Sequence, residues 1–166
     1  MMQKIGFGGG CHWCTEAVFE SLAGVEKVLQ GWISSSAAGA ASFSEAVVVH
    51  FDPETIPLEV LTEIHLLTHR STANHAMRSK YRSAIYTFDD AQRAEAEKIL
   101  RAKAALFEKP IVTVVLPFKA FKLNDDRFLH YYRQDPQRPF CRRYIEPKLQ
   151  LILSRYGQYA GAGRRT

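Results

Sequence analysis

The sequence predicts an α/β or α+β sandwich in which helices pack on one mixed β-sheet. Strand-like and helix-like segments alternate along the chain, and no internal repeat or linker interrupts them. The length of 166 residues and the hydrophobic content of 46% suit a domain that buries a sizeable core. We therefore expect one domain over residues 1–156 and a flexible tail at 157–166.

The first half of the chain is expected to contain three strands and two helices. Apolar residues such as Ala17 and Leu22 share one face of the first helix, which Gly24 ends. A run of β-branched residues that closes at Asp52 is typical of a strand, and Pro57 fits the first turn of the second helix. The expected strands are 4–10, 25–34 and 45–53, the helices are 15–24 and 57–69, and a small, flexible loop lies at 34–42.

The second half is expected to contain two strands and three helices. The clearest helix can be capped by Asp89 or Asp90, and its acidic residues precede its basic ones. The sequence "IVTVVLP" is typical of a buried strand. The expected strands are 82–88 and 111–117, the helices are 89–107, 125–134 and 145–157, and a loop lies at 135–140.

The charge and hydropathy of the chain exclude several classes of protein. The net charge is +5, but the basic residues form no dense stripe with interleaved aromatic residues, so we do not expect nucleic-acid binding. No apolar run approaches the roughly 20 residues of a membrane-spanning helix. The first residues also lack the long apolar segment of a signal peptide. We expect a cytoplasmic monomer that does not enter a membrane.

The stretch "GFGGGCHWCTEAVFE", residues 6–20, carries the clearest chemical signal. Cys11 follows three glycines and precedes a predicted helix. A thiol at a helix N-terminus lies near unpaired backbone N–H groups and the positive end of the helix dipole, both of which favour the thiolate. The glycines allow backbone and substrate to approach closely. Cys11 is therefore a candidate nucleophile.

The spacing of Cys11 and Cys14 leaves several interpretations open. The chain has three cysteines, an odd number that argues against a disulfide scaffold. A zinc site needs four ligands, and only Cys141 remains to join the first two, so we expect no metal. A thioredoxin-like exchange site and two packed, inert thiols both remain compatible with the motif.

Four segments, in order along the chain, resemble the peptide methionine sulfoxide reductases of the A type. "FGGGCHWCTEAVFE" resembles the nucleophile motif of this family, and "SEAVVVHFDPETIPLEVLTEI" its glutamate-bearing strand, Asp-Pro turn and helix. "KYRSAIYTF" is similar to its Gln-Tyr-Arg-Ser strand, and "YYRQDPQRPFCRRYIEPKL" to its C-terminal segment. The matches span roughly residues 4–150, most of the chain.

The resemblance implies a two-layer sandwich with a ferredoxin-like core and a three-step reduction of methionine S-sulfoxide, peptidyl or free. Cys11 would attack the sulfoxide sulfur, while Glu45 would protonate the departing oxygen and Tyr81 would bind it. The resulting sulfenic acid would condense with a resolving thiol to form a disulfide. Cys141 is slightly favoured for that step over Cys14, which can instead serve packing. Thioredoxin would then reduce the disulfide, and no bound cofactor or metal is implied.

The sequence departs from the family pattern around the expected substrate pocket. His12 replaces an aromatic residue that, with the retained Trp13, would hold the S-methyl group of the substrate. The loop 33–44 is shorter than usual and contains no tyrosine, and "SFSE" replaces the residues around the catalytic acid. Ala76 stands where the family has an aspartate. The neighbouring segment is basic through His69, Arg70, His75, Arg78 and Lys80.

These departures predict retained sulfur chemistry with an altered substrate. A pocket lined by His12, Trp13, His75 and Arg78 would suit an acidic or zwitterionic sulfoxide better than a methionine within a protein. Two other functions stay open at this point. One is thiol–disulfide exchange by Cys11 and Cys14 alone, and the other is a catalytically impaired member that senses redox state.

Overall fold

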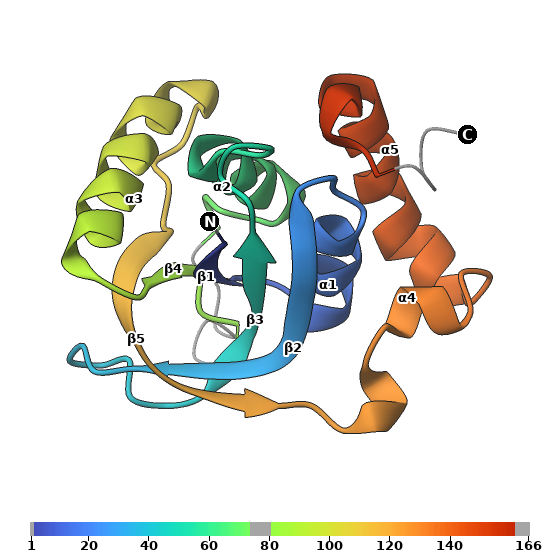
Figure 1. Ribbon diagram of the computed structural model, residues 1–166, viewed down its shortest axis with the longest axis horizontal. Helices are drawn as coiled ribbons and strands as arrows, with labels where there is room; N and C mark the ends of the chain where they lie inside the picture. Colours follow the sequence, from blue (N-terminus) through green and yellow to red (C-terminus); the bar gives the residue numbers. More distant parts are fainter. Residues whose placement is uncertain (1, 74–80, 162–166) are drawn as a thin grey trace.

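The computed structural model describes residues 2–73 and 81–161, which form five strands and a set of helices (Figure 1). The strands are β1 (Gln3–Gly8), β2 (Val25–Ser35), β3 (Ser44–Phe51), β4 (Ala84–Thr87) and β5 (Val114–Leu123). The α-helices are α1 (His12–Glu20), α2 (Leu58–Thr68), α3 (Asp90–Lys103), α4 (Tyr131–Gln134) and α5 (Glu146–Arg155). A π-helical turn over Cys141–Ile145 leads into α5, and 3₁₀ turns lie at Ala104–Leu106, Asp126–Phe128 and Gly157–Tyr159.

The sheet is mixed, as the sequence predicts, but it closes on itself in the order β1-β3-β2-β5-β4. The strand β1 pairs with both β3 and β4, and only β4 and β5 run parallel. The expectation of a two-layer sandwich with a ferredoxin-like core is therefore wrong, because the sheet is a closed barrel. Closure depends on the long strand β2, which pairs with β3 along most of its length and with β5 near its end.

Gly31 marks the point at which β5 crosses β2. A Cβ atom at this position would lie 2.0 Å from the carbonyl oxygen of Lys122 on β5, so only glycine lets the two backbones come this close. Trp32, the next residue along β2, pairs with both Glu45 on β3 and Lys122 on β5. The crossing therefore sets the position of the strand that carries Glu45.

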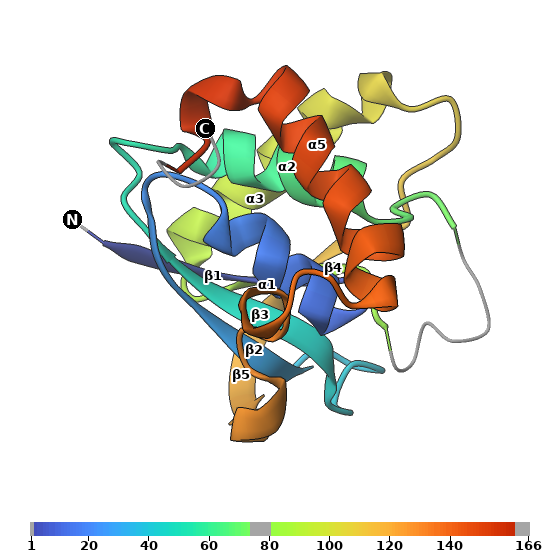
Figure 2. The same ribbon diagram turned by 90° about the vertical axis from the view of Figure 1, so that its right-hand side faces the viewer.

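The main core lies between the barrel and the helices α1, α2 and α5, which gather on one side of it (Figure 2). Phe7 of β1 stacks on Phe19 of α1 with ring centroids 4.8 Å apart. Leu61 and Ile64 of α2 are fully buried in the same cluster. Burial of these side chains fixes α1 against the barrel, and with it the N-terminus at which Cys11 lies.

Two of the expected elements in the second half differ from the observed ones. The strand predicted at 111–117 begins three residues later and extends to Leu123, and none of its residues is fully buried. The helix predicted at 125–134 is divided by His130, whose backbone is left-handed with φ of 54°. The result is a 3₁₀ turn followed by the short helix α4.

The C-terminal residues 157–161 contact the rest of the chain, although the sequence predicts a flexible tail from residue 157. Ala160 forms an isolated β-bridge with Leu22, and the N–H of Gly161 donates to the carbonyl of Ser21 at 2.7 Å. The rest of the predicted tail lies outside the described residues. Within the described ranges, the helices are too short or too polar to span a bilayer.

Candidate functional site

Cys11 lies in the turn that joins β1 to α1, as the residue that caps the helix. The turn depends on Gly9, whose φ of 147° suits glycine and whose missing side chain leaves room for the His69 ring. A Cβ atom on Gly9 would lie 2.5 Å from that ring. The carbonyl of Cys11 accepts hydrogen bonds from the N–H groups of Cys14 at 3.1 Å and Thr15 at 3.2 Å. The first turn thus holds Cys11 at the helix N-terminus, as the sequence predicts.

A hydrogen bond between the Cys11 and Cys14 side chains is the largest influence on the Cys11 thiol. It lowers the pKa of Cys11 below its ordinary value, and the backbone N–H groups of Trp13 and Cys14 act in the same direction. Burial and the nearby charge of Glu45 oppose this effect and raise the pKa of Cys11. The same hydrogen bond, together with burial, raises the pKa of Cys14. Cys11 therefore ionises first, and Cys14 remains a thiol that donates a hydrogen bond to the Cys11 sulfur.

Cys141 belongs to the same core cluster as Cys14. It is fully buried in the main core, in the π-helical turn that precedes α5, and its burial raises the pKa of its thiol. Its charge influences Cys14, whereas Cys14 is the cysteine that contacts Cys11. All three cysteines are free thiols in the structure.

Glu45 is buried on β3, the strand between β1 and β2. Because β3 pairs on both sides, Glu45 does not lie at an edge of the sheet. The backbone N–H of His12 donates to Oε1 of Glu45 at 3.3 Å, which places the carboxylate beside the first turn of α1. The effect of its charge on Cys11 places the two groups in the same site.

Arg82 connects the segments that carry Glu45 and Tyr81. Its guanidinium donates to the carbonyl oxygens of Ile33 at 3.2 Å and Ser42 at 3.0 Å, and its backbone N–H donates to Oγ of Ser44 at 2.7 Å. The short loop before β3 is therefore tied to the residue that follows Tyr81. These hydrogen bonds hold the segment that carries Tyr81 against the start of β3, which carries Glu45.

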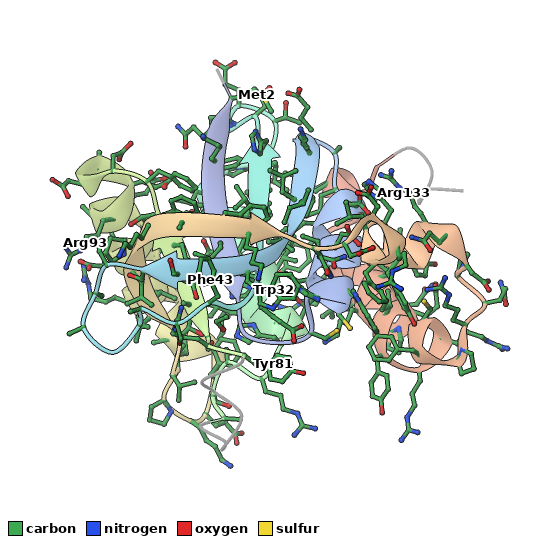
Figure 3. All side chains as sticks on the ribbon, turned by 90° about the horizontal axis from the view of Figure 1, so that it is seen from below. Met2, Trp32, Phe43, Tyr81, Arg93 and Arg133 are labelled. Carbon is green, nitrogen blue, oxygen red and sulfur yellow. The ribbon has the colours of Figure 1, made fainter. Side chains whose placement is uncertain are left out.

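A cavity of about 570 Å³ opens beside Cys11. Tyr81 lines it together with Cys11 and Cys14, and Figure 3 shows the Tyr81 side chain directed away from the sheet. Three basic residues, His69, Arg70 and Lys148, complete the polar part of the lining. The cavity is large enough for a small ligand and presents cations to it.

The basic lining is held in place by contacts with the backbone and with hydroxyl groups. Lys148 of α5 donates to the carbonyl oxygen of Thr68 at the end of α2. His69 lies 2.5 Å from the His65 carbonyl oxygen through Nδ1 and 2.8 Å from the Ser83 hydroxyl through Nε2. These contacts hold the Lys148 ammonium group and the His69 ring at the wall of the cavity that Cys11 borders.

The side chains of His12 and Trp13 do not line this cavity. His12 is 5% exposed and turns inward, with Nδ1 2.9 Å from the carbonyl oxygen of Gly31. The imidazole of His12 is therefore buried, although the sequence predicts that it lines the substrate pocket. Trp13 stacks on Tyr131 at 4.1 Å between centroids, within a cluster that includes Phe128 and Phe140. His75, Ala76 and Arg78 lie outside the described residues, so their expected roles stay predictions.

Sequence reasoning did not assign site roles to Arg82, Lys148 or Asn124. Arg82 could have been found, because it directly follows Tyr81 in the Tyr-Arg-Ser motif. Lys148 lies about 140 residues from Cys11 along the chain, and only the packing of α5 against α1 brings them together. Asn124, whose Nδ2 lies 3.4 Å from Nε2 of His12, follows a strand whose boundaries were predicted wrongly, so its position was not accessible to sequence reasoning.

Among the described residues, one group could hold a metal ion. Glu16, Glu20 and His130 offer ligand atoms within 4.8 Å of one another. Glu16, however, already accepts hydrogen bonds from the Gln30 amide and from the backbone N–H groups of His130 and Tyr131. These bonds account for the buried carboxylate without an ion.

Comparison with known sequences gives one family for nearly the whole chain. The model of the family "Peptide methionine sulfoxide reductase" matches residues 3–159. Peptide methionine sulfoxide reductase MsrA of Psychrobacter sp. (strain PRwf-1) is 34% identical over 173 residues, which cover 95% of this chain and 98% of that protein. An MsrA of Thermus thermophilus is 34% identical over 155 residues, covering 86% and 88%.

Solved structures with the same fold include Mxr1 of Saccharomyces cerevisiae in its reduced form. It has a TM-score of 0.71 and 22% identity, and the match covers 82% of this chain and 87% of that one. Methionine sulfoxide reductase A of Corynebacterium diphtheriae gives a TM-score of 0.69 at 23% identity, covering 81% and 76%. Mxr1 in complex with Trx2 gives a TM-score of 0.60 at 23% identity, covering 78% and 84%.

Proposed function

The chain belongs to the peptide methionine sulfoxide reductase family, and from this premise we propose that Cys11 reduces methionine sulfoxide to methionine. The observation that carries the assignment to Cys11 is its thiol at the N-terminus of α1, which accepts a hydrogen bond from Cys14 and borders the cavity. A thiolate is the form of cysteine that attacks sulfur, and this environment favours it.

In the first step, the Cys11 thiolate attacks the sulfur of the sulfoxide. The sulfoxide oxygen takes a proton and transfers to Cys11, so that methionine leaves and Cys11 becomes a sulfenic acid. The methionine sulfur is reduced by two electrons, and the Cys11 sulfur is oxidised by two. Glu45 supplies the proton, because its carboxyl group is buried beside Cys11. The hydroxyl group of Tyr81, which lines the cavity, donates a hydrogen bond to the same oxygen.

In the second step, Cys14 is the resolving thiol. The sequence favours Cys141 slightly for this role, but the hydrogen bond between Cys14 and Cys11 supports Cys14 as the first partner. The Cys14 sulfur bonds to the Cys11 sulfur, and the sulfenic oxygen leaves as water. Cys141 then exchanges with Cys14, which frees Cys11 and leaves a disulfide between Cys14 and Cys141.

A count of methionine per protein tests this relay. Reduced protein is mixed with excess methionine sulfoxide and no external reductant. The relay frees Cys11 for a second attack, so wild-type protein forms two equivalents, whereas Cys141→Ser stops at one. A single equivalent from both proteins would show that Cys141 does not exchange with a disulfide between Cys11 and Cys14. One equivalent from Cys14→Ser with a disulfide between Cys11 and Cys141 would restore Cys141 as the first resolving thiol.

An external dithiol then completes the cycle by reducing the disulfide. We propose a thioredoxin for this role, in keeping with the complex that yeast Mxr1 forms with Trx2. The steps above use only side chains of this chain and need no bound organic group or metal. With thioredoxin and its reductase present, turnover should continue in wild-type protein and cease in Cys11→Ser.

Free methionine sulfoxide, or another small sulfoxide with a carboxylate, is the second candidate for the substrate. The observation in its favour is the pair of cations Arg70 and Lys148, which line the cavity beside Cys11. A carboxylate would meet both of them in a partly enclosed site. The sequence suggested the same preference through His75 and Arg78, whose contribution stays a prediction.

The decisive experiment compares a peptide that contains methionine sulfoxide with the free amino acid. If the cations bind a substrate carboxylate, kcat/KM is higher for the free sulfoxide, and Lys148→Met lowers it mainly through KM. Equal values for the two substrates, unchanged in Lys148→Met, would contradict the preference. Failure to form methionine from either substrate would contradict the reduction itself.

A further inference from the structure

A buried chain of polar side chains connects Glu45 with the interior of the molecule through His12. Nε2 of His12 lies 3.4 Å from Oε1 of Glu45 and 3.4 Å from Nδ2 of Asn124. Asn124 in turn donates to the side-chain oxygen of Gln30 at 2.6 Å, and Gln30 donates to Glu16 at 2.8 Å. The helix α1 carries His12 and Glu16 of this polar chain and packs against β2 and β3 (Figure 2).

The hydrogen bonds around His12 assign its protons. The carbonyl oxygen of Gly31 can only accept, so Nδ1 carries a hydrogen in every state of the ring. Nε2 is then the nitrogen that gains or loses a proton. When it is bare it accepts from the Asn124 amide, and when it is protonated it donates to Glu45. The site therefore offers a partner to both forms of His12.

Other contacts keep the amide groups in the orientation that this scheme needs. The side-chain oxygen of Asn124 accepts from the N–H of Asp125 at 2.8 Å, so its nitrogen must face His12 and Gln30. Gln30 donates to Glu16 and to the carbonyl of Phe128 at 2.9 Å, which leaves its oxygen for Asn124. The side-chain amides of Asn124 and Gln30 are thus each oriented by a backbone group that can only donate or only accept a hydrogen bond.

We propose that His12 and Glu45 share one proton and that His12 is a positioning residue that supplies it to Glu45 for the sulfoxide oxygen. The proposal rests on the proposed function of Cys11 and extends it. The proton moves from Nε2 of His12 to Oε1 of Glu45 and from Glu45 to the oxygen, while the thiolate forms its bond to sulfur. His12 ends neutral, with Asn124 as donor, and regains a proton from water before the next cycle.

The charges that face His12 agree with this role. Glu45 on β3 lies beside the ring, and Cys11 precedes His12 at the start of α1. On the β2 side, the His12 ring contacts Trp32 edge-on, and Lys122 of β5 lies over the Trp32 ring at 5.9 Å. The carboxylate of Glu45 favours an imidazolium, and Lys122 makes its ring contact with Trp32. Glu16, one turn along α1, is already paired with Gln30.

The pH dependence of a single turnover tests the proposal. The matched variants are His12→Asn, whose amide can still donate to Gly31, and His12→Gln, whose amide can still reach Glu45. Neither side chain titrates. Since a carboxyl group loses its proton at lower pH than an imidazole, the basic limb of the rate profile should move down by about one pH unit or more in both variants. The Cys11 thiolate is titrated separately in each protein by alkylation.

An NMR titration supplies a second measurement that needs no activity and covers the case in which a His12 variant does not fold. The His12 imidazole should titrate about one pH unit or more lower in Glu45→Gln than in wild-type protein, because the variant lacks the negative partner. An unchanged midpoint, or a basic limb that stays in place while rates fall uniformly at every pH, overturns the proposal. If wild-type protein forms no methionine at any pH, the proposed function fails instead.

Discussion

The thiols of Cys11 and Cys14 share a hydrogen bond, yet their tendencies to ionise are opposite. Cys14 donates, so the bond stabilises a thiolate on Cys11 and opposes one on Cys14. The difference follows from position, because Cys11 caps α1 and lies nearer the N–H groups of its first turn. Cys11 is therefore the cysteine that can act as a nucleophile, and Cys14 is its hydrogen-bond donor.

Replacement of Cys14 should therefore make Cys11 less reactive at neutral pH. In Cys14→Ala the hydrogen bond is lost, so the pKa of Cys11 rises and the midpoint of its alkylation moves up by about one pH unit or more. The rate of Cys11 alkylation, followed by mass spectrometry across a pH series, measures this shift.

Cys141→Ala is the matched control, because Cys141 acts on Cys14 and is absent from the influences on Cys11. It should leave the alkylation midpoint of Cys11 at its wild-type value. A midpoint that stays the same in Cys14→Ala would show that the helix N-terminus alone sets the reactivity.

Residues inside short motifs were predictable from the sequence, and those positioned by distant contacts were not. Cys11 could be recognised because glycines, thiol and helix are consecutive. The burial of Glu45 could not, since it depends on neighbours on both sides of β3. The direction of the His12 ring was equally hidden, because its partners Gly31 and Asn124 come from other strands and loops.

The helix α1 is fixed at the element scale by a buried carboxylate. Glu16, 1% exposed, accepts from the N–H groups of His130 at 2.9 Å and Tyr131 at 3.1 Å, as well as from Gln30. Burial raises the pKa of Glu16, whereas the hydrogen bonds that its two carboxylate oxygens accept from His130, Gln30 and Tyr131 oppose this effect. This one side chain attaches the loop before α4 to the helix that begins at Cys11.

Glu16→Gln should lower the free energy of unfolding by about 1–3 kcal/mol, because its amide nitrogen would face an N–H donor and leave one buried group unpaired. Denaturation in urea measures the change. Glu97→Gln is a suitable control, since the pair that Glu97 forms with Arg93 is exposed. Equal stability of the two variants would mean that the loop is held by other contacts.

Element boundaries show the same division between local and distant causes. The helix α3 begins at Asp90, and Asp89 caps it through a bond from the N–H of Gln92, as the local sequence predicts. The strand β5 starts later than its apolar run suggests, because its pairing with β4 and β2 determines which residues join the sheet. Strand limits depend on partners that no window of sequence contains.

At the scale of the whole molecule, the closed barrel requires a close approach of β2 and β5 at Gly31. Gly31→Ala should destabilise the protein by about 1–3 kcal/mol or more, because the added methyl group would overlap the Lys122 carbonyl and separate β2 from β5. Gly157→Ala is the control, since no atom lies within 4 Å of a Cβ atom there. Thermal unfolding of both variants, compared with wild-type protein, gives the result; a change as small in Gly31→Ala as in the control would show that the crossing relaxes freely.

Closure of the sheet also has a consequence for the behaviour of the protein in a crowded solution. Each of the five described strands has a neighbour on both sides. Exposed sheet edges are the places where one polypeptide can extend the sheet of another and start an insoluble assembly. Where a strand is paired on both sides, as at 6–8 of β1 and 31–33 of β2, the described sheet offers no such edge to another chain.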